Sequence, residues 1–136
     1  MQNSEFEDYL KSKDLRITRP RLEIFKSLYK TDKPLSIVEI IKDNPELDKV
    51  TIYRTIETFT SSGVILPVIN GWKSKYELSD KFKDHHHHFT CTKCGRVLDI
   101  NSPKLESAIS SIEDLLDAKV NFHHIELHGL CSNCKV

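Results

Sequence analysis

The sequence has no apolar run long enough to cross a bilayer, and its start, MQNSEFEDYL, lacks the basic residues and apolar stretch of a signal peptide. We therefore expect a cytoplasmic protein with no membrane partner. Net charge is missing as well, since 20 Lys+Arg balance 20 Asp+Glu, which argues against nonspecific binding of polyanions. The sequence contains no phosphate-binding loop and no evident Ser/His/Asp set, so it does not favour an enzyme.

Cysteine is scarce, but the 4 cysteines form two Cys-x-x-Cys pairs, Cys91/Cys94 and Cys131/Cys134. In a reducing compartment, this spacing indicates a zinc site rather than disulfides. Gly95, directly after the first pair, relieves crowding in the turn that brings two thiolates onto one ion. We predict a closed tetrahedral site in which zinc is structural.

Charge and histidine are unevenly distributed along the chain. Residues 1–83 are mildly basic, and all 7 histidines lie after residue 84. A chain of this length can bury one ordinary core or two small ones. We predict two domains, which comprise residues 1–80 and 81–136.

The spacing of apolar residues in the first domain predicts helices. Thr18 and Ser36 are suitable N-caps, and Pro20 is suited to a first helical turn. The predicted helices lie within residues 4–14, 18–30, 36–44 and 48–63, and the predicted strands are residues 64–69 and 73–78, around the turn Asn-Gly-Trp. Helices followed by a hairpin are typical of a winged helix-turn-helix DNA-binding domain.

The fourth predicted helix has a face suited to reading DNA. Ile52, Ile56 and Phe59 recur at helical spacing and should face the core, which turns Tyr53 and Arg54 outward. An aromatic edge can contact thymine methyl groups, and a guanidinium can bind guanine through two hydrogen bonds. The alternative is an ordinary solvated face, and the pair alone does not decide between them.

The second domain is predicted to be a small α+β unit that forms dimers. Ser102 and Pro103 mark the start of a helix, and strand candidates precede and follow it. We expect an antiparallel three-stranded sheet plus this helix. The apolar face of the helix and the exposed sheet edge suit dimerisation.

The segment DHHHHFTCTKCGR contains four consecutive histidines. A purification tag usually lies at a terminus, and this run lies at neither, so we do not interpret it as a tag. If it forms a strand, His86 and His88 lie on one face and His85 and His87 on the other, so two pairs can serve two ions. The alternative is a set of ordinary surface residues. Further candidate ligands in the chain are Glu77, Asp99, Glu106, His123, His124 and His128.

Five segments of the chain, taken in order, resemble the ferric uptake regulator family, which includes zinc-sensing and peroxide-sensing branches. They are LRITRPR, VTIYRTIETF, YELSD, HHHHFTCTKCG and HHIELHGLCSNC. The resemblance implies a homodimer with winged-helix arms. When metallated, it would bind palindromic operators in double-stranded DNA and repress metal-uptake or peroxide-defence genes.

The resemblance also implies roles for individual residues. The four cysteines match the structural zinc site of the family. The regulatory metal site is matched by Glu77, His86, His88 and Asp99, a second metal site by His85, His87, Glu106 and His123, and the DNA-binding positions by Arg16, Thr51, Tyr53 and Arg54. The family usually adds a regulatory histidine before the third helix, where this chain has Lys33, Pro34, Leu35 and Ser36.

The predicted regulatory ligands are nitrogen and oxygen atoms, because all the cysteines are committed elsewhere. Such ligands suit Fe(II), which we favour, and also admit Mn(II), Zn(II) and Co(II). Asp99 resembles the peroxide-sensing branch, but that branch oxidises the histidine that is missing here, so peroxide sensing is disfavoured. The competing function is a zinc-ribbon interaction module or metal-storage module without DNA binding.

Overall fold

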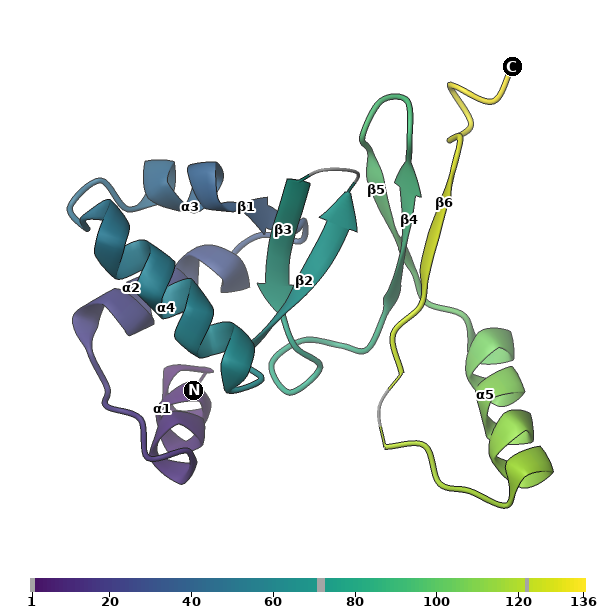
Figure 1. Cartoon of the computed structure of the whole chain (residues 1–136), viewed down its shortest axis with the longest axis horizontal. Coiled ribbons are helices and arrows are strands. Elements are labelled where there is room, and N and C mark those ends of the chain that lie inside the picture. Colours follow the sequence, from purple (N-terminus) through teal and green to yellow (C-terminus); the bar gives the residue numbers. More distant parts are fainter. Residues whose placement is uncertain (1, 71–72, 122) are drawn as a thin grey trace. The chain divides into compact units, whose positions relative to one another are not determined.

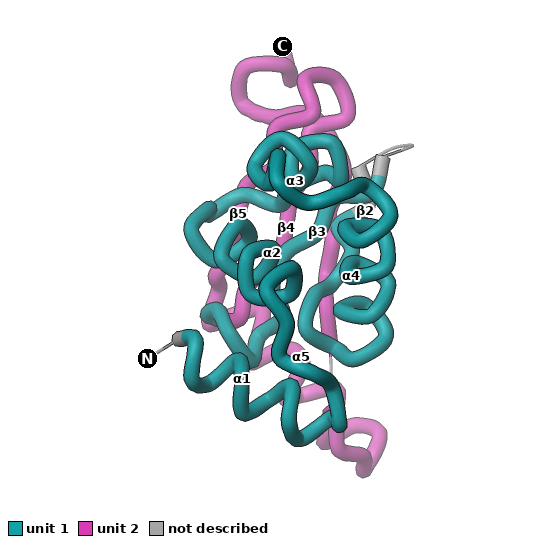
Figure 2. Tube along the Cα trace, turned by 90° about the vertical axis from the view of Figure 1, so that its left-hand side faces the viewer, with its two compact units in different colours: residues 1–84 teal, residues 85–136 magenta. Residues whose placement is uncertain are grey.

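The chain forms two compact units, Met1–Asp84 and His85–Val136 (Figure 2). The computed structural model describes residues 2–70, 73–121 and 123–136. Phe82 belongs with the first unit, since its ring packs edge-on against Phe6 and Tyr9 at centroid distances of 6.0 and 5.4 Å. The first unit therefore extends past residue 80. Within the described residues, no helix is long and apolar enough to span a membrane.

The described residues of the first unit form four helices, as the sequence predicts. They are α1 (Gln2–Ser12), α2 (Arg19–Tyr29), α3 (Ile37–Asp43) and α4 (Lys49–Ser61) (Figure 1). The side chains of Thr18, Ser36 and Asp48 accept backbone N–H bonds at the starts of α2, α3 and α4, which satisfies donors that have no partner within the helix. Gly63 follows α4 at φ 78°, a left-handed conformation that favours glycine after a helix end.

The helices enclose one apolar core. The rings of Phe6 and Phe25 stack at 4.0 Å between centroids, and Phe59 packs edge-on against Phe6 at 5.6 Å. Ile52, Ile56 and Phe59 are all buried, which confirms the predicted inward face of α4. Burial on this scale stabilises the unit by about 1.5–3 kcal/mol for each large side chain.

A small antiparallel sheet forms the wing of the first unit. Its strands are β1 (Leu35–Ser36), β2 (Ile65–Asn70) and β3 (Lys73–Leu78), in the order β1-β3-β2. The predicted hairpin of β2 and β3 is confirmed, whereas residues 71–72 of its predicted turn lie outside the described residues. Strand β1 was missed because a two-residue strand carries no periodicity. Helices and wing together form a winged helix-turn-helix.

In the second unit, residues 85–121 and 123–136 form a three-stranded sheet and one helix. Its elements are β4 (His87–Cys91), β5 (Val97–Ile100), α5 (Pro103–Leu116) and β6 (Glu126–Gly129), with strand order β5-β4-β6. The pairing of β4 with β5 is antiparallel, but β6 runs parallel to β4, so the prediction of an antiparallel three-stranded sheet was wrong. The physical reason is the place of β4, which lies between the other two strands. The chain leaves β5 and returns after α5 in the opposite direction, so β6 runs antiparallel to β5 and therefore parallel to β4.

Helix α5 begins as predicted, with Ser102 as N-cap and Pro103 at its first position. It lies beyond the end of the strands instead of covering the sheet (Figure 1). Its apolar side chains remain largely exposed, including Ile112 at 45%, Leu116 at 64% and Leu115 at 82%. Among the described residues, α5 has no buried side chain, so the second unit does not use its helix to build a core.

Candidate metal centres and DNA-binding surface

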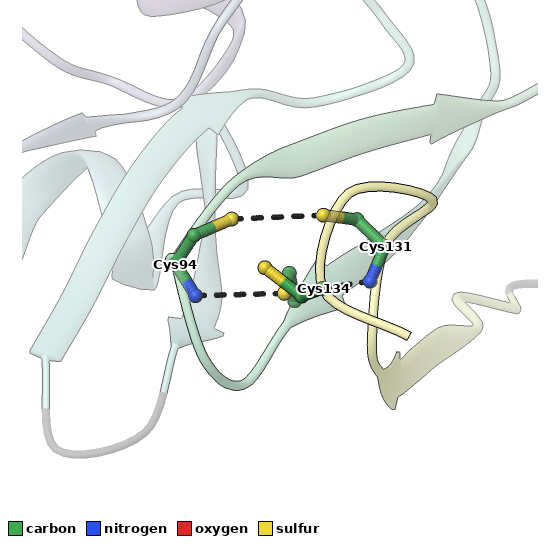
Figure 3. Close-up of side chains that lie close together, drawn as sticks. Cys94, Cys131 and Cys134 are labelled. Carbon is green, nitrogen blue, oxygen red and sulfur yellow. Dashed lines mark hydrogen bonds between the residues drawn. The ribbon is translucent and has the colours of Figure 1, made fainter. Parts of the chain in front are cut away.

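Two turns bring the four cysteines together at one end of the second sheet. Ligand atoms of Cys91, Cys94, Cys131 and Cys134 all lie within 4.8 Å of one another. Figure 3 shows the sulfur atoms of Cys94 and Cys131 facing each other, 3.8 Å apart, with Cys134 beside them. Gly95 has φ 77°, which lets the first turn close and its N–H bond to the Cys91 carbonyl at 2.9 Å.

The electrostatics of this cluster favour a cation. Backbone N–H groups of Cys94 and Cys131 point at the sulfur of Cys91 and lower the pKa of that thiol to about 6. A hydrogen bond with Cys131, together with burial, raises the pKa of Cys134 to about 12. The sulfurs therefore cannot all carry negative charge unless a cation lies among them. Four convergent thiolates are the donor set of a closed, structural zinc site.

A second cluster joins β4 to α5 and to the segment before β6. The ligand atoms of His85, His87, Glu106 and His123 lie within 4.8 Å of one another. The Glu106 carboxylate is 2.8 Å from His87 Nε2, 2.7 Å from His123 Nε2 and 3.2 Å from His85 Nε2. Glu106 lies in the first turn of α5, so the Ser102 cap helps to fix its position.

The protonation of the second cluster suits a neutral histidine beside an ionised carboxylate. Burial lowers the pKa of His87 below its ordinary value. Burial also raises the pKa of Glu106, but hydrogen bonds from His87 and His123 outweigh this and leave its pKa lowered. His87 Nδ1 accepts the N–H of Ile125 at 3.0 Å, so its Nε2 carries the proton and donates to Glu106. Coordination through Nε2 would require the Ile125 N–H to turn to another acceptor.

The other face of the sheet carries the remaining histidine pair. The rings of His86 and His88 lie 4.9 Å apart, and His88 Nε2 is 3.8 Å from Asp99 Oδ1. His88 and Asp99 are register partners across β4 and β5, which places both side chains on the same face. Glu77, the fourth residue predicted for this site, is a buried residue of β3 in the first unit.

The sequence did not reveal that His124 and Glu126 join His88 in a further cluster. Ligand atoms of these three residues lie within 4.8 Å of one another. This cluster could be predicted only from the register of β6 against β4, in which Glu126 is the partner of His88. A strand whose direction was predicted wrongly could not supply that register.

The predicted DNA-binding residues lie on the surface of the first unit. Tyr53 is 54% exposed, and Arg54 and Arg16 are exposed as well. Thr51 and Arg54 of α4 line a shallow hollow together with Thr18 and other residues at the start of α2. The start of α2 and the outer face of α4 therefore border one surface, which carries the positive charges of Arg21 and Arg54.

Comparisons with known proteins place these features in context. The sequence profile described as "Ferric uptake regulator family" matches residues 12–128. The ferric uptake regulation protein of Bordetella parapertussis is 31% identical, and the match covers 93% of this chain and 94% of that protein. The peroxide-responsive repressor PerR of Staphylococcus saprophyticus is 28% identical, and the match covers 93% of this chain and 86% of that repressor. The crystal structure of the Vibrio cholerae ferric uptake regulator superposes on this chain with a TM-score of 0.73 at 26% identity. The superposition covers 92% of this chain and 98% of the Vibrio cholerae chain.

Proposed function

The chain belongs to the ferric uptake regulator family of metal-responsive DNA-binding repressors, and we propose that it acts in the cytoplasm as a homodimer on palindromic operators of metal-uptake genes. The observation that carries this proposal is the surface of α4. Tyr53 and Arg54 are exposed on a helix whose other face is fixed in an apolar core. A rigid helix with an exposed aromatic ring and guanidinium is suited to reading base edges in the major groove.

In this proposal, the DNA contacts are divided between two elements. Arg16, in the segment before α2, would enter the minor groove, and Thr51, Tyr53 and Arg54 of α4 would contact the major groove. In the dimer, two such helices would lie about one helical turn, roughly 34 Å, apart on the operator. A palindromic operator matches the two-fold symmetry of a homodimer.

The metals have separate roles in the proposal. Cys91, Cys94, Cys131 and Cys134 would hold the structural zinc and tie the chain end to β4. Glu77 of the first unit, together with His86, His88 and Asp99 of the second, would hold the regulatory cation. Ligands from both units would restrict the orientation of the winged helix relative to the dimer, which favours the arrangement that fits the operator.

The second cluster would hold a further cation. His85, His87, Glu106 and His123 link β4, α5 and the segment before β6. They would brace the dimerisation unit and leave the DNA-binding arm free.

Iron is the regulatory metal that we favour, with zinc or manganese as alternatives. The proposed ligands are imidazole nitrogens and carboxylate oxygens, which suit Fe(II) and Mn(II) and also bind Zn(II). Lys33 and Pro34 occupy the place where the family usually has a regulatory histidine, so Glu77 is the chief tie between the first unit and the cation. Peroxide sensing is disfavoured because the peroxide-sensing branch oxidises the histidine that is missing here.

Selection of operator DNA from a random pool tests the proposal and the choice of metal together. Protein that retains its structural zinc would be incubated with the pool in the presence of Fe(II), Mn(II) or Zn(II), and the bound DNA would be sequenced. The proposal predicts an enriched palindrome, strongest with Fe(II) under anaerobic conditions. Enrichment of no sequence with any of the three metals would contradict it, and would favour a metal-storage or interaction module.

A further inference from the structure

We propose that His88, His124 and Glu126 form an additional binding site for a divalent cation, contained entirely within the second unit. Their ligand atoms already lie within 4.8 Å of one another. Ligand atoms around one transition-metal ion, at about 2.0–2.2 Å from it, are separated by up to about 4.4 Å. Closing the site therefore needs only small side-chain movements.

The sheet itself assembles these residues. His88 pairs in register with Asp99 of β5 on one side and with Glu126 of β6 on the other. Register partners place their side chains on the same face, so Asp99, His88 and Glu126 form a row across the three strands. His124 precedes Glu126 by two residues, and its Nε2 is 3.3 Å from Glu126 Oε1. The ring of His124 lies 5.4 Å from that of His88.

The burial of the cluster suits a cation site that ions can reach from solvent. The side chain of His88 is 0% exposed, whereas those of His124 and Glu126 are 17% and 19% exposed. Partly buried ligands hold a cation more tightly than exposed ones, because less water competes for it. Two imidazoles and a carboxylate form a nitrogen and oxygen donor set that Zn(II), Co(II) and Fe(II) accept.

His128 offers a matched comparison on the same strand. It follows Glu126 by two residues, lies 3.8 Å from Glu126 Oε2 and has a side chain that is 42% exposed. Its separation from Glu126 is the larger of the two, and it does not belong to the cluster with His88. If any surface imidazole near Glu126 could hold the ion, His128 would matter as much as His124.

The additional site has a consequence for regulation, which rests on the proposed regulatory site. His88 is a ligand in both sets, so one imidazole cannot serve both cations through the same nitrogen. An ion at His124 and Glu126 would need no residue of the first unit. The protein could therefore hold a cation at His88 without restricting the orientation of its winged helix, and the two positions would compete.

Titration with Co(II) tests the additional site, because the visible absorption of this ion depends on its ligands. Full-length protein with structural zinc would carry Glu77→Gln, which removes the proposed tie to the first unit. Adding His124→Gln or Glu126→Gln to this variant should weaken Co(II) binding at one site by at least about tenfold and change its spectrum. Adding His128→Gln should leave both unchanged. Equal Co(II) affinity and spectrum in all four proteins would overturn the proposal.

Two further readouts keep the result interpretable. Retention of structural zinc and of the far-UV circular dichroism spectrum would show that each variant is folded. If a variant unfolds, NMR of the Glu77→Gln protein with Co(II) gives the answer, because the ring signals of His124 should shift more than those of His128; larger shifts at His128 would overturn the site. The titration contains no DNA, so failure of metal-dependent operator binding would contradict the proposed function alone.

Discussion

The two units differ in what lies at their centres. The core cluster of the first unit consists of apolar side chains. Phe25 and Phe59, for example, both pack against the ring of Phe6. Among the described residues of the second unit, the buried side chains are instead Cys91, Cys131, His87, His88 and Thr90. Four of these five are candidate metal ligands.

We infer from this contrast that the two units have separate sources of stability. Buried apolar area stabilises the first unit whether or not metal is present. The second unit buries few apolar side chains. In the proposed function, bound cations and a second copy would add to its stability. We therefore predict that the proposed DNA-reading surface stays folded without metal, whereas the second unit depends on metal for its structure.

The largest predicted effect is the loss of folding free energy in the second unit when the structural zinc is removed. Cys94→Ser removes a ligand, and zinc sites of this kind contribute about 10–16 kcal/mol to folding at neutral pH. We expect residues 85–136 to lose amide protection and the dimer to dissociate, while residues 19–61 keep their protection. Hydrogen exchange followed by mass spectrometry and size-exclusion chromatography would measure both.

Lys93→Ala, an exposed neighbour in the same turn, is the matched control for Cys94→Ser. It should retain zinc, protection and dimer. Equal loss of protection in both units of the Cys94→Ser protein would show that the units do not have independent sources of stability.

A cavity in the first unit should destabilise that unit and leave the second unit unchanged. Phe59→Ala removes a fully buried ring and should cost about 3–5 kcal/mol of unfolding free energy, measured by urea denaturation of the first unit. The zinc content of the second unit should stay unchanged. Glu57→Ala, an exposed change on the same helix, should cost less than about 0.5 kcal/mol. Release of zinc from the Phe59→Ala protein would argue against separate stabilisation.

The exposed face of α5 should matter for association more than for monomer stability. Leu116→Asp introduces charge on the apolar face, where Ile112 lies one turn earlier. It should weaken the dimer by about 2–3 kcal/mol, which is about 30- to 160-fold in dissociation constant. Ser110→Asp places the same charge on the opposite side of the helix and should leave the dimer intact. Analytical ultracentrifugation distinguishes the two, and equal dimerisation of both variants would place the interface elsewhere.

Loss of base reading should be the smallest of these effects. Arg54→Ala should reduce discrimination between operator and random DNA by about 1–3 kcal/mol, because a guanidinium that binds guanine through two hydrogen bonds is removed. Lys49→Ala, at the start of the same helix, should weaken binding to both DNAs alike. An unchanged ratio of the two affinities in the Arg54→Ala protein would show that α4 is not the recognition helix.

Local chemistry explains how much of the structure the sequence could predict. The caps at Thr18, Ser36 and Ser102 and the apolar stripe of α4 are local signals, so the helices were predicted almost in full. The alternation of His85 to His88 is local too, and the structure groups these side chains by the predicted parity. Strand direction and register depend on distant residues.

The parallel pairing of β6 was therefore missed, and with it the cluster of His124 and Glu126 around His88. The resemblance to a family did not supply this cluster either. Only the paired strands bring these residues together, because His88 and Glu126 are far apart in the sequence.

Fluorescence anisotropy on the selected operator tests the central claim, that metal bound by the second unit controls DNA reading by the first. Protein with its structural zinc alone would be titrated onto labelled operator with and without the regulatory metal. We predict at least about tenfold tighter binding with the metal, and loss of this difference in Glu77→Gln. Equal affinity with and without added metal would contradict the account.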